Sequence, residues 1–190
     1  MNHNILLVGS LVGASLFCAA SAEENLLENG DFSNARGKSV VKWVLPQSTL
    51  RGHGDDASYF EYGVAEDSDG GKSLRLAVTE PVTSHFWWQQ EVAALPGTEY
   101  QLTVRYRGEV EELGAGFAGE DVGLYFLDRD KHWIGYVRAS DKEILDGEWH
   151  EIELSATSPD EAAFIGVRLG VMGNQAMEFH FDNVVLEFAD

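Results

Sequence analysis

The chain has 190 residues and a formal net charge of −19, from 32 acidic residues against 13 Lys and Arg. This charge argues against nucleic acid, whose phosphates need basic neutralisation, and against anionic membranes and strongly acidic polysaccharides. Two interpretations stay open. The acidity is either a solvated surface suited to a salty exterior, or a bias toward neutral glycans or cations as ligands.

Residues 1–22 have the pattern of a secretory signal peptide. An uncharged apolar stretch ends at Ala20-Ser21-Ala22, which fits the small-x-small cleavage pattern. The stretch is too short and too rich in Gly and Ser for a membrane span. We therefore expect a secreted protein, extracellular or periplasmic, whose mature chain is residues 23–190. The alternative is a lipid anchor at Cys18, which the bulky Phe17 before it disfavours.

Residues 23–190 are expected to form one all-β domain. Cleavage would remove the only cysteine, so we expect no disulfide. Short runs of alternating apolar and polar residues lie between Gly-, Pro- and Asp-rich turn signals, and helical periodicity is almost absent. This pattern predicts a β-sandwich of the jelly-roll type, with its first and last strands side by side. In chain order, strand patterns occupy residues 25–32, 74–78, 85–92, 100–107, 122–126, 149–154, 165–169 and 179–186.

Strand alternation assigns each of these residues a side, because successive side chains point to opposite faces. Of two adjacent tryptophans, Trp88 is expected to face the core with Phe86, and Trp87 to face outward with Gln89. Gln90 also falls on the core face, where its amide would need a buried partner. By the same rule, Arg105 and Tyr125 are expected to face outward. The residues expected to face the core are Tyr100, Leu102, Val104, Tyr106, Val122, Leu124 and Phe126.

Several short motifs follow one another in a characteristic order. They are Asn25-Leu26-Leu27-Glu28-Asn29-Gly30-Asp31-Phe32, Trp43, Gly71-Lys72-Ser73-Leu74-Arg75-Leu76, Gln90, Leu95-Pro96-Gly97-Thr98-Glu99-Tyr100, Phe126-Leu127-Asp128, Gly147-Glu148-Trp149 and Phe181-Asp182-Asn183-Val184. In order and spacing they resemble carbohydrate-binding modules of families 4, 9, 16 and 22. The resemblance spans nearly all of the mature chain and implies a galactose-binding-like jelly roll. Members of that superfamily bind different sugars, and some bind none, so the resemblance does not name the ligand.

The resemblance implies a structural Ca²⁺ that joins the turn after the first strand to an Asp near the last strand. Here Asp182 matches that Asp, and Asp31 and Ser33 occupy the turn. Lys72 stands where a backbone carbonyl contributes in the family. Calcium prefers such a mixture of carboxylate and carbonyl oxygens, although Ser33 replaces a Glu that is common in the family. The alternative is that Asp31 and Asp182 only accept hydrogen bonds from turn amides.

The resemblance also implies a sugar site on one sheet face. A pyranose packs its C–H face on an aromatic ring, and its hydroxyl groups pair with planar amides and guanidinium groups. Trp43 and Trp149 are interpreted as packing residues. The candidates expected to lie outward on one sheet are Trp87, Gln89, Arg105 and Tyr125, with Trp133 and Tyr136 as a wall or lid.

The sequence predicts a protein without catalytic activity. Glu151 and Glu153 would share a strand face about 7 Å apart, but the Glu-x-Asp-x-x-Glu pattern of jelly-roll glucanases does not occur around them. We therefore expect a secreted, monomeric module that binds a neutral polysaccharide or oligosaccharide, with no nucleic-acid or membrane partner. The alternatives are a structural or adhesive cell-surface protein and, less favoured, a small glycoside hydrolase or polysaccharide lyase.

Overall fold

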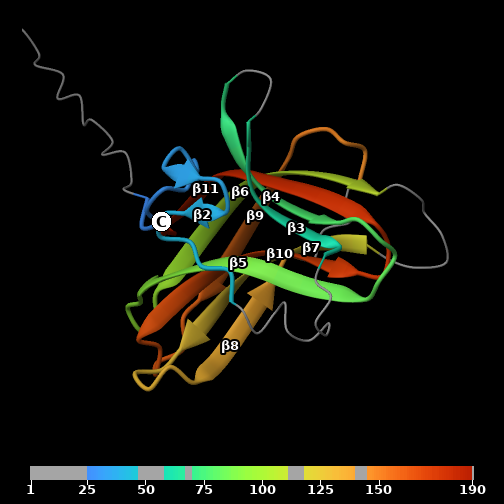
Figure 1. Cartoon of the computed structure of the whole chain (residues 1–190). Coiled ribbons are helices and arrows are strands. Elements are labelled where there is room, and N and C mark those ends of the chain that lie inside the picture. Colours follow the sequence, from blue (N-terminus) through green and yellow to red (C-terminus); the bar gives the residue numbers. More distant parts are fainter. Residues whose placement is uncertain (1–24, 47–57, 67–69, 111–117, 140–144, 190) are drawn as a thin grey trace, which may run out of the picture.

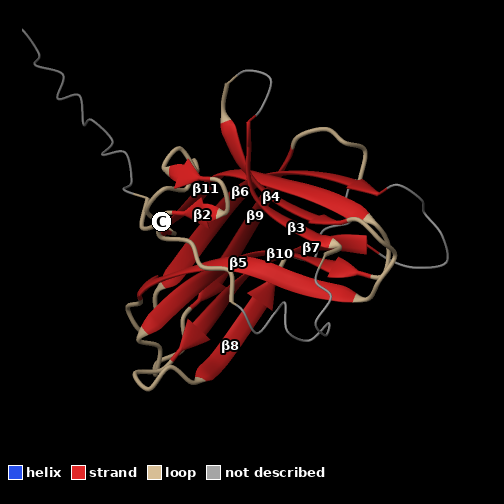
Figure 2. Cartoon of the chain, in the orientation of Figure 1, coloured by secondary structure: helices blue, strands red, loops and turns tan. Residues whose placement is uncertain are grey.

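The computed structural model describes five segments of the chain, residues 25–46, 58–66, 70–110, 118–139 and 145–189. Within these segments the regular elements are β-strands, and most of them form two sheets that pack face to face (Figure 1 and Figure 2). The described part of the chain contains no helix of sufficient length and apolarity to cross a membrane. The expected all-β sandwich is confirmed. The predicted signal peptide, residues 1–22, and Cys18 lie outside the described residues.

One sheet has four antiparallel strands in the order β5-β10-β7-β8. β10 lies inside the sheet and pairs along its whole length with β5 and β7, while β8 forms one edge. This sheet occupies the lower half of Figure 1, with β8 lowest. The bounds of its strands are β5 (Ser84–Ala93), β7 (Ala118–Leu127), β8 (Trp133–Arg138) and β10 (Phe164–Gly173).

The other large sheet has five antiparallel strands in the order β3-β4-β11-β6-β9. A bulge interrupts the pairing of its central strand β11 with β6 between Asp182 and Val185. A small separate hairpin consists of β1 (Ala35–Arg36) and β2 (Ser39–Val40). The bounds of the five strands are β3 (Phe60–Glu66), β4 (Lys72–Val78), β6 (Glu99–Val110), β9 (His150–Thr157) and β11 (Met177–Phe188).

The N-terminal segment lies beside β11, the last strand, as the sequence predicted. The Leu26 N–H donates to the Leu186 carbonyl at 2.8 Å, and the Val184 N–H donates to the Gly30 carbonyl at 3.0 Å. The Asn25 side chain accepts from the Leu186 N–H at 3.0 Å and donates to the Val184 carbonyl at 2.9 Å. The segment nevertheless forms bends and turns, so the strand expected over residues 25–32 is wrong.

Strand alternation places the core as expected. In β5, Phe86 and Trp88 are buried, and Trp87 and Gln89 lie on the opposite face. These buried rings and those of the facing sheet remove apolar surface from water, which is the main favourable contribution to folding. Further side chains expected in the core are buried there, namely Trp43, Tyr100, Leu102, Val104, Tyr106, Val122, Leu124 and Phe126.

Gln90 shows how a polar side chain is accommodated on the core face of β5. Its side-chain oxygen accepts a hydrogen bond from the Glu28 N–H at 2.8 Å. Its side-chain nitrogen donates to the Glu28 carbonyl at 2.9 Å. The amide thus has the partner that burial demands, and it fixes the N-terminal segment to the sandwich.

The substitution Gln90→Leu is expected to lower the free energy of unfolding by about 1–3 kcal/mol, because it leaves the Glu28 amide and carbonyl without their partner. Urea denaturation measures the change. Gln89→Leu, one position along β5 on the opposite face, is the matched control and should cost less than about 1 kcal/mol. Equal losses in the two variants would contradict this role of Gln90.

Candidate functional site

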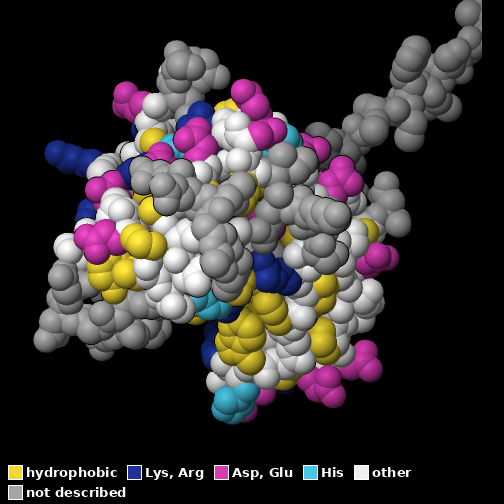
Figure 3. Space-filling view, turned by 90° about the vertical axis from the view of Figure 1, so that its right-hand side faces the viewer, with side chains coloured by type: hydrophobic (Ala, Val, Ile, Leu, Met, Phe, Trp, Pro, Cys, Tyr) yellow, Lys and Arg dark blue, Asp and Glu magenta, His cyan; other side chains and the backbone are white. Residues whose placement is uncertain are grey.

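The face of the four-stranded sheet that is turned away from the core, here called the platform face, carries a layer of aromatic rings. Tyr125 and Trp133 stack with nearly parallel planes, their centroids 4.8 Å apart at an angle of 9°. Tyr125 is only 1% exposed, whereas Trp133 is 51% exposed. The ring centroid of Tyr136 lies 5.9 Å from that of Trp133, and Tyr136 is 37% exposed. In Figure 3, hydrophobic side chains gather in the lower half of the molecule, the level at which this sheet lies in Figure 1. Basic and histidine side chains lie next to them.

Glycines in the strands allow these rings to lie flat on the sheet. A Cβ atom at Gly166 would lie 2.1 Å from Cζ of the Tyr125 ring, and one at Gly123 would lie 2.6 Å from Cε2 of the Tyr136 ring. Both distances are far shorter than two carbon atoms can approach. A larger residue at either position would therefore lift the ring off the sheet.

A buried carboxylate, Asp121 of β7, lies among the rings. Its Oδ2 is 2.7 Å from Nε2 of His85 and accepts a hydrogen bond from Arg168 at 3.1 Å. Its Oδ1 accepts from the Tyr136 hydroxyl at 2.7 Å. Burial alone would raise the pKa of Asp121, but the hydrogen bonds from His85 and Tyr136 and the charge of Arg168 lower this pKa to about 2. The carboxylate is therefore ionised at neutral pH.

Arg168 of β10 lies within the aromatic layer. Its guanidinium carbon is 3.9 Å from the ring centroid of Trp87, 5.0 Å from that of Tyr136 and 5.1 Å from that of Trp133. Cations favour the faces of aromatic rings at such distances. The side chain points away from the core, yet the residue is only 7% exposed. The contacting rings thus account for much of its burial.

Hydrogen bonds fix two further members of the layer. The Tyr125 hydroxyl donates to Glu91 at 3.0 Å, and Lys131 donates to the other oxygen of the same carboxylate at 2.7 Å. Burial raises the pKa of Tyr125, and the charge and hydrogen bond of Glu91 raise it further. The Trp87 indole N–H donates to the Gln89 side-chain oxygen at 3.0 Å. The polar groups of this face therefore orient the rings.

The structure brings five of the six expected sugar-site residues onto the platform face. These are Trp87, Gln89, Tyr125, Trp133 and Tyr136. Tyr125 belongs to the buried layer under Trp133, so it supports the exposed ring.

Arg105 is not part of this group, and the expectation that it shares a sheet with Trp87 is wrong. It lies on β6, which pairs with β9 and β11 in the other sheet. There its guanidinium carbon is 4.8 Å from the Trp149 ring centroid, and its Nη1 is 3.6 Å from Oδ2 of Asp182. The chain crosses between the two sheets after β5, and alternation within a strand carries no information about that crossing.

Sequence reasoning did not single out His85, Asp121 or Arg168. The segment Gly166-Val167-Arg168-Leu169-Gly170 contains a usable signal, because its alternation puts an arginine between two glycines on the face opposite the buried Val167 and Leu169. Glycine within a strand often marks a place where another group approaches the backbone closely. That pattern would have directed attention to this face of β10.

The four residues expected at a calcium site line one pocket of about 260 Å³. Asp31 and Asp182 supply carboxylates, and Ser33 supplies a hydroxyl group. Both carboxylates also accept hydrogen bonds from local amides, Asp31 from Ser33 at 3.2 Å and Asp182 from Asn183 at 2.7 Å. The Lys72 ammonium group donates to the Ser33 carbonyl at 3.0 Å and places a positive charge there. The oxygen donors suit Ca²⁺, whereas the lysine charge opposes it.

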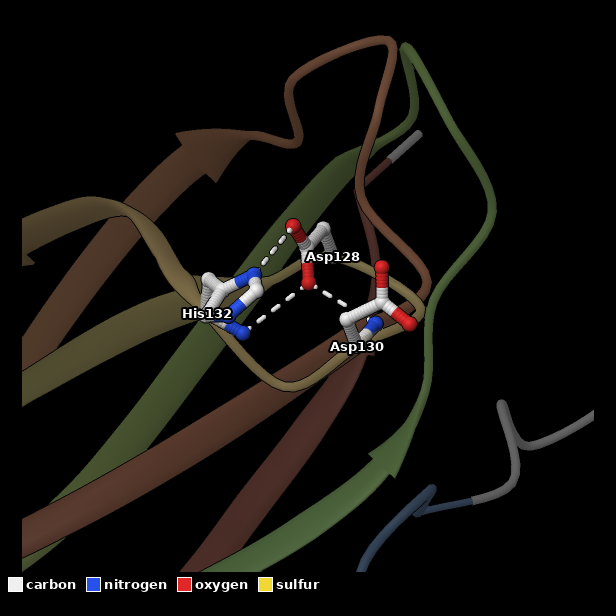
Figure 4. A group of neighbouring side chains, drawn as sticks. All are labelled: Asp128, Asp130 and His132. Carbon is white, nitrogen blue, oxygen red and sulfur yellow. Dashed lines mark hydrogen bonds and ion pairs between the residues drawn. The ribbon is translucent and has the colours of Figure 1, made fainter.

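A second group of potential metal ligands, Asp128, Asp130 and His132, lies in the turn between β7 and β8 (Figure 4). The Asp128 carboxylate accepts hydrogen bonds from the backbone N–H groups of Asp130 and His132, each at 2.9 Å. The His132 N–H, above all, holds the pKa of Asp128 below its ordinary value. These bonds are those of a turn closed by an aspartate. The turn leads directly into β8, which begins at Trp133.

The five-stranded sheet carries two arrangements that resemble catalytic groups. Ser73 Oγ lies 2.9 Å from Nδ1 of His180, whose Nε2 lies 2.7 Å from Glu178. Ser73 is fully buried, so a substrate cannot reach its hydroxyl in this conformation. Glu151 and Glu153 lie on β9, in the sheet opposite the platform face.

Comparison with known proteins identifies the fold. No protein-family model and no curated protein sequence match the chain. Among solved structures, the tailspike protein 4 enzymatically active domain of bacteriophage CBA120 matches with a TM-score of 0.64 and 15% identity. That match covers 87% of this chain and 21% of the tailspike chain, so this chain spans about a fifth of that neighbour's length.

Two carbohydrate-binding modules match over nearly their whole length. The CBM22-1 xylan-binding domain of Paenibacillus barcinonensis Xyn10C has a TM-score of 0.55 and 12% identity, with 90% of this chain and 97% of that chain covered. The Family 16 Carbohydrate Binding Module-2 has a TM-score of 0.53 and 19% identity, with 85% and 99% covered. The chain therefore has the β-sandwich fold of the carbohydrate-binding modules that its sequence resembles.

Proposed function

We propose that this protein binds a neutral polysaccharide through the platform face, without chemical change to the glycan. The observation that carries the proposal is the stack of Trp133 on Tyr125, which leaves the outer tryptophan half-exposed. A pyranose presents an apolar face that can pack on such a ring. Tyr136 and Trp87 extend the aromatic surface on either side of the Arg168 guanidinium group.

The pairing of charges on this face favours an uncharged glycan. Arg168 is paired with Asp121 at 3.1 Å, and Lys131 with Glu91 at 2.7 Å. A uronate-bearing chain would have to compete with these carboxylates for the cations. The net charge of −19 acts in the same direction.

The state of the carboxylates supports binding without catalysis. Most glycoside hydrolases use a protonated carboxylic acid beside the scissile bond. The pKa of Asp121 is about 2, so this group holds no proton at neutral pH. Both oxygens of the Glu91 carboxylate accept hydrogen bonds, one from the Tyr125 hydroxyl and the other from Lys131. This carboxylate therefore helps to hold the Tyr125 ring. We infer in addition, from residues 1–22, that the protein is secreted, and we expect it to act as a monomer.

Affinity electrophoresis in gels containing xylan, β-glucan, mannan or laminarin provides the test. We expect retardation by at least one of these glycans, and Trp133→Ala should weaken it about tenfold or more, because the exposed ring is lost. Trp149→Ala, directly before β9 of the other sheet, is the control and should be retarded like the unmodified protein. Xylan is the first choice, since one structural neighbour is a xylan-binding domain.

Unretarded migration on all four glycans would count against glycan binding and would favour the structural or adhesive alternative. Equal weakening by Trp133→Ala and Trp149→Ala would place the site elsewhere. A reducing-sugar assay on the same glycans separates binding from hydrolysis, and release of reducing ends would overturn the non-catalytic part of the proposal.

We also propose that the pocket around Asp31, Ser33 and Asp182 holds a structural Ca²⁺. The ion would neutralise two carboxylates that link the N-terminal turn to β11. Its contribution is to the stability of the fold, and no step of glycan binding depends on it.

Calcium bound only by the folded protein must raise its melting temperature. Unfolding followed by circular dichroism should therefore show a lower melting temperature in EDTA than in CaCl₂, and Asp31→Asn should reduce that difference. Glu153→Gln, which removes an exposed acid on β9, should leave the difference unchanged. Identical melting temperatures of the unmodified protein in EDTA and CaCl₂ would rule the ion out.

A further inference from the structure

Glycines occupy three of the positions next to Arg168 on its face of the sheet. Gly166 and Gly170 precede and follow it on the same face of β10, and Gly123 of β7 is its partner in the ladder. A Cβ atom at Gly170 would lie 2.7 Å from Cβ of Trp87. These three positions around the arginine carry no side chain, and rings from neighbouring strands occupy the space there, whereas its partner on β5 is Gln89.

The guanidinium group of Arg168 contacts one carboxylate and three aromatic rings. Asp121 accepts a hydrogen bond from its Nη1 at 3.1 Å. Its buried Nε has no hydrogen-bond acceptor among the described residues, and the nearest aromatic centroid, that of Trp87, is 3.9 Å from Cζ. The face of the Trp87 ring therefore attracts the guanidinium cation through a cation–π interaction.

The same carboxylate also holds a ring directly. Asp121 accepts from the Tyr136 hydroxyl at 2.7 Å, so Arg168 and Tyr136 are bound to one group. Trp87 contacts Arg168 from β5, and Tyr136 contacts it from β8. Rings at the two edges of the sheet are thereby linked through one buried ion pair in its middle.

We propose that Arg168, held by Asp121, is a positioning residue that sets Trp87 and Tyr136 in their binding arrangement before the glycan arrives. Fixing side chains in advance reduces the ordering cost that binding would otherwise incur. This inference rests on the proposed glycan binding by the platform face. Arg168 itself is buried beneath the rings and acts through them.

The experiment compares Arg168→Met and Arg168→Lys with a matched control, Arg75→Met. Arg75 is an ion-paired arginine on the five-stranded sheet, bound to Glu61 at 2.8 Å and to Glu178 at 2.6 Å.

Melting temperatures are recorded first, and affinity electrophoresis on the four glycans is then run on each variant that is folded. We expect Arg168→Met to weaken retardation about tenfold and Arg75→Met to bind normally, although Arg75→Met loses two ion pairs. Arg168→Lys should remain weakened, because an ammonium group lacks the planar guanidinium that packs against the rings.

Normal binding by folded Arg168→Met, or full restoration by Arg168→Lys, would overturn the positioning role. Equal weakening in Arg75→Met would also overturn it, because the effect would then be general destabilisation. If Arg168→Met does not fold, Arg168→Lys decides, with weakened binding in favour and normal binding against.

A ligand-free measurement separates this inference from the proposed function. The indole N–H resonance of Trp87 in nitrogen-15 NMR spectra reports the surroundings of its ring, including its hydrogen bond to Gln89, without any glycan. We expect this resonance to move in Arg168→Lys and to keep its position in Arg75→Met. An unmoved resonance in Arg168→Lys would contradict the positioning role. Unretarded unmodified protein together with a moved resonance would refute glycan binding alone.

Discussion

The platform depends on one steric constraint, the close approach of aromatic rings to a strand backbone that carries no side chain beneath them. Gly166 and Gly123 leave room for the rings of Tyr125 and Tyr136, which a single added carbon would displace. Because Tyr125 lies flat and buried, Trp133 can stack on it in parallel and present its outer face to solvent. The glycines thus determine how the exposed ring is oriented.

The polar groups of the face form a layer that holds the aromatic one. Asp121 binds His85, Tyr136 and Arg168 together, and Glu91 binds Tyr125 and Lys131. A buried ion pair contributes little to stability when its desolvation is counted. Its value here is geometric, because it fixes rings that come from different strands. The same commitment of carboxylates to structure agrees with a face that binds glycans without cleaving them.

The sequence predicted the sandwich fold, the core and most of the exposed rings, but it predicted no strand at β3 or β8. Alternation in β5 correctly separated Trp87 from Trp88, since each lies where the period of two puts it. Arg105 was misplaced because the side of a strand can be inferred locally, whereas the sheet it joins depends on where the chain crosses over. Asp121 and Arg168 escaped notice because their burial arises from rings on other strands. In the sequence near Arg168, only the glycines on either side of it indicate that other groups approach this face closely.

The most direct test of the account compares tryptophans of the platform face with tryptophans elsewhere in the chain. In nitrogen-15 NMR spectra the indole resonances are recorded during titration with a neutral oligosaccharide such as xylohexaose or its β-glucan, mannan or laminarin counterpart. The account predicts saturable shifts for Trp133 and Trp87 of the platform face and constant positions for Trp43 and Trp149. A glycan that binds while shifting Trp149 and leaving Trp133 unmoved would contradict it.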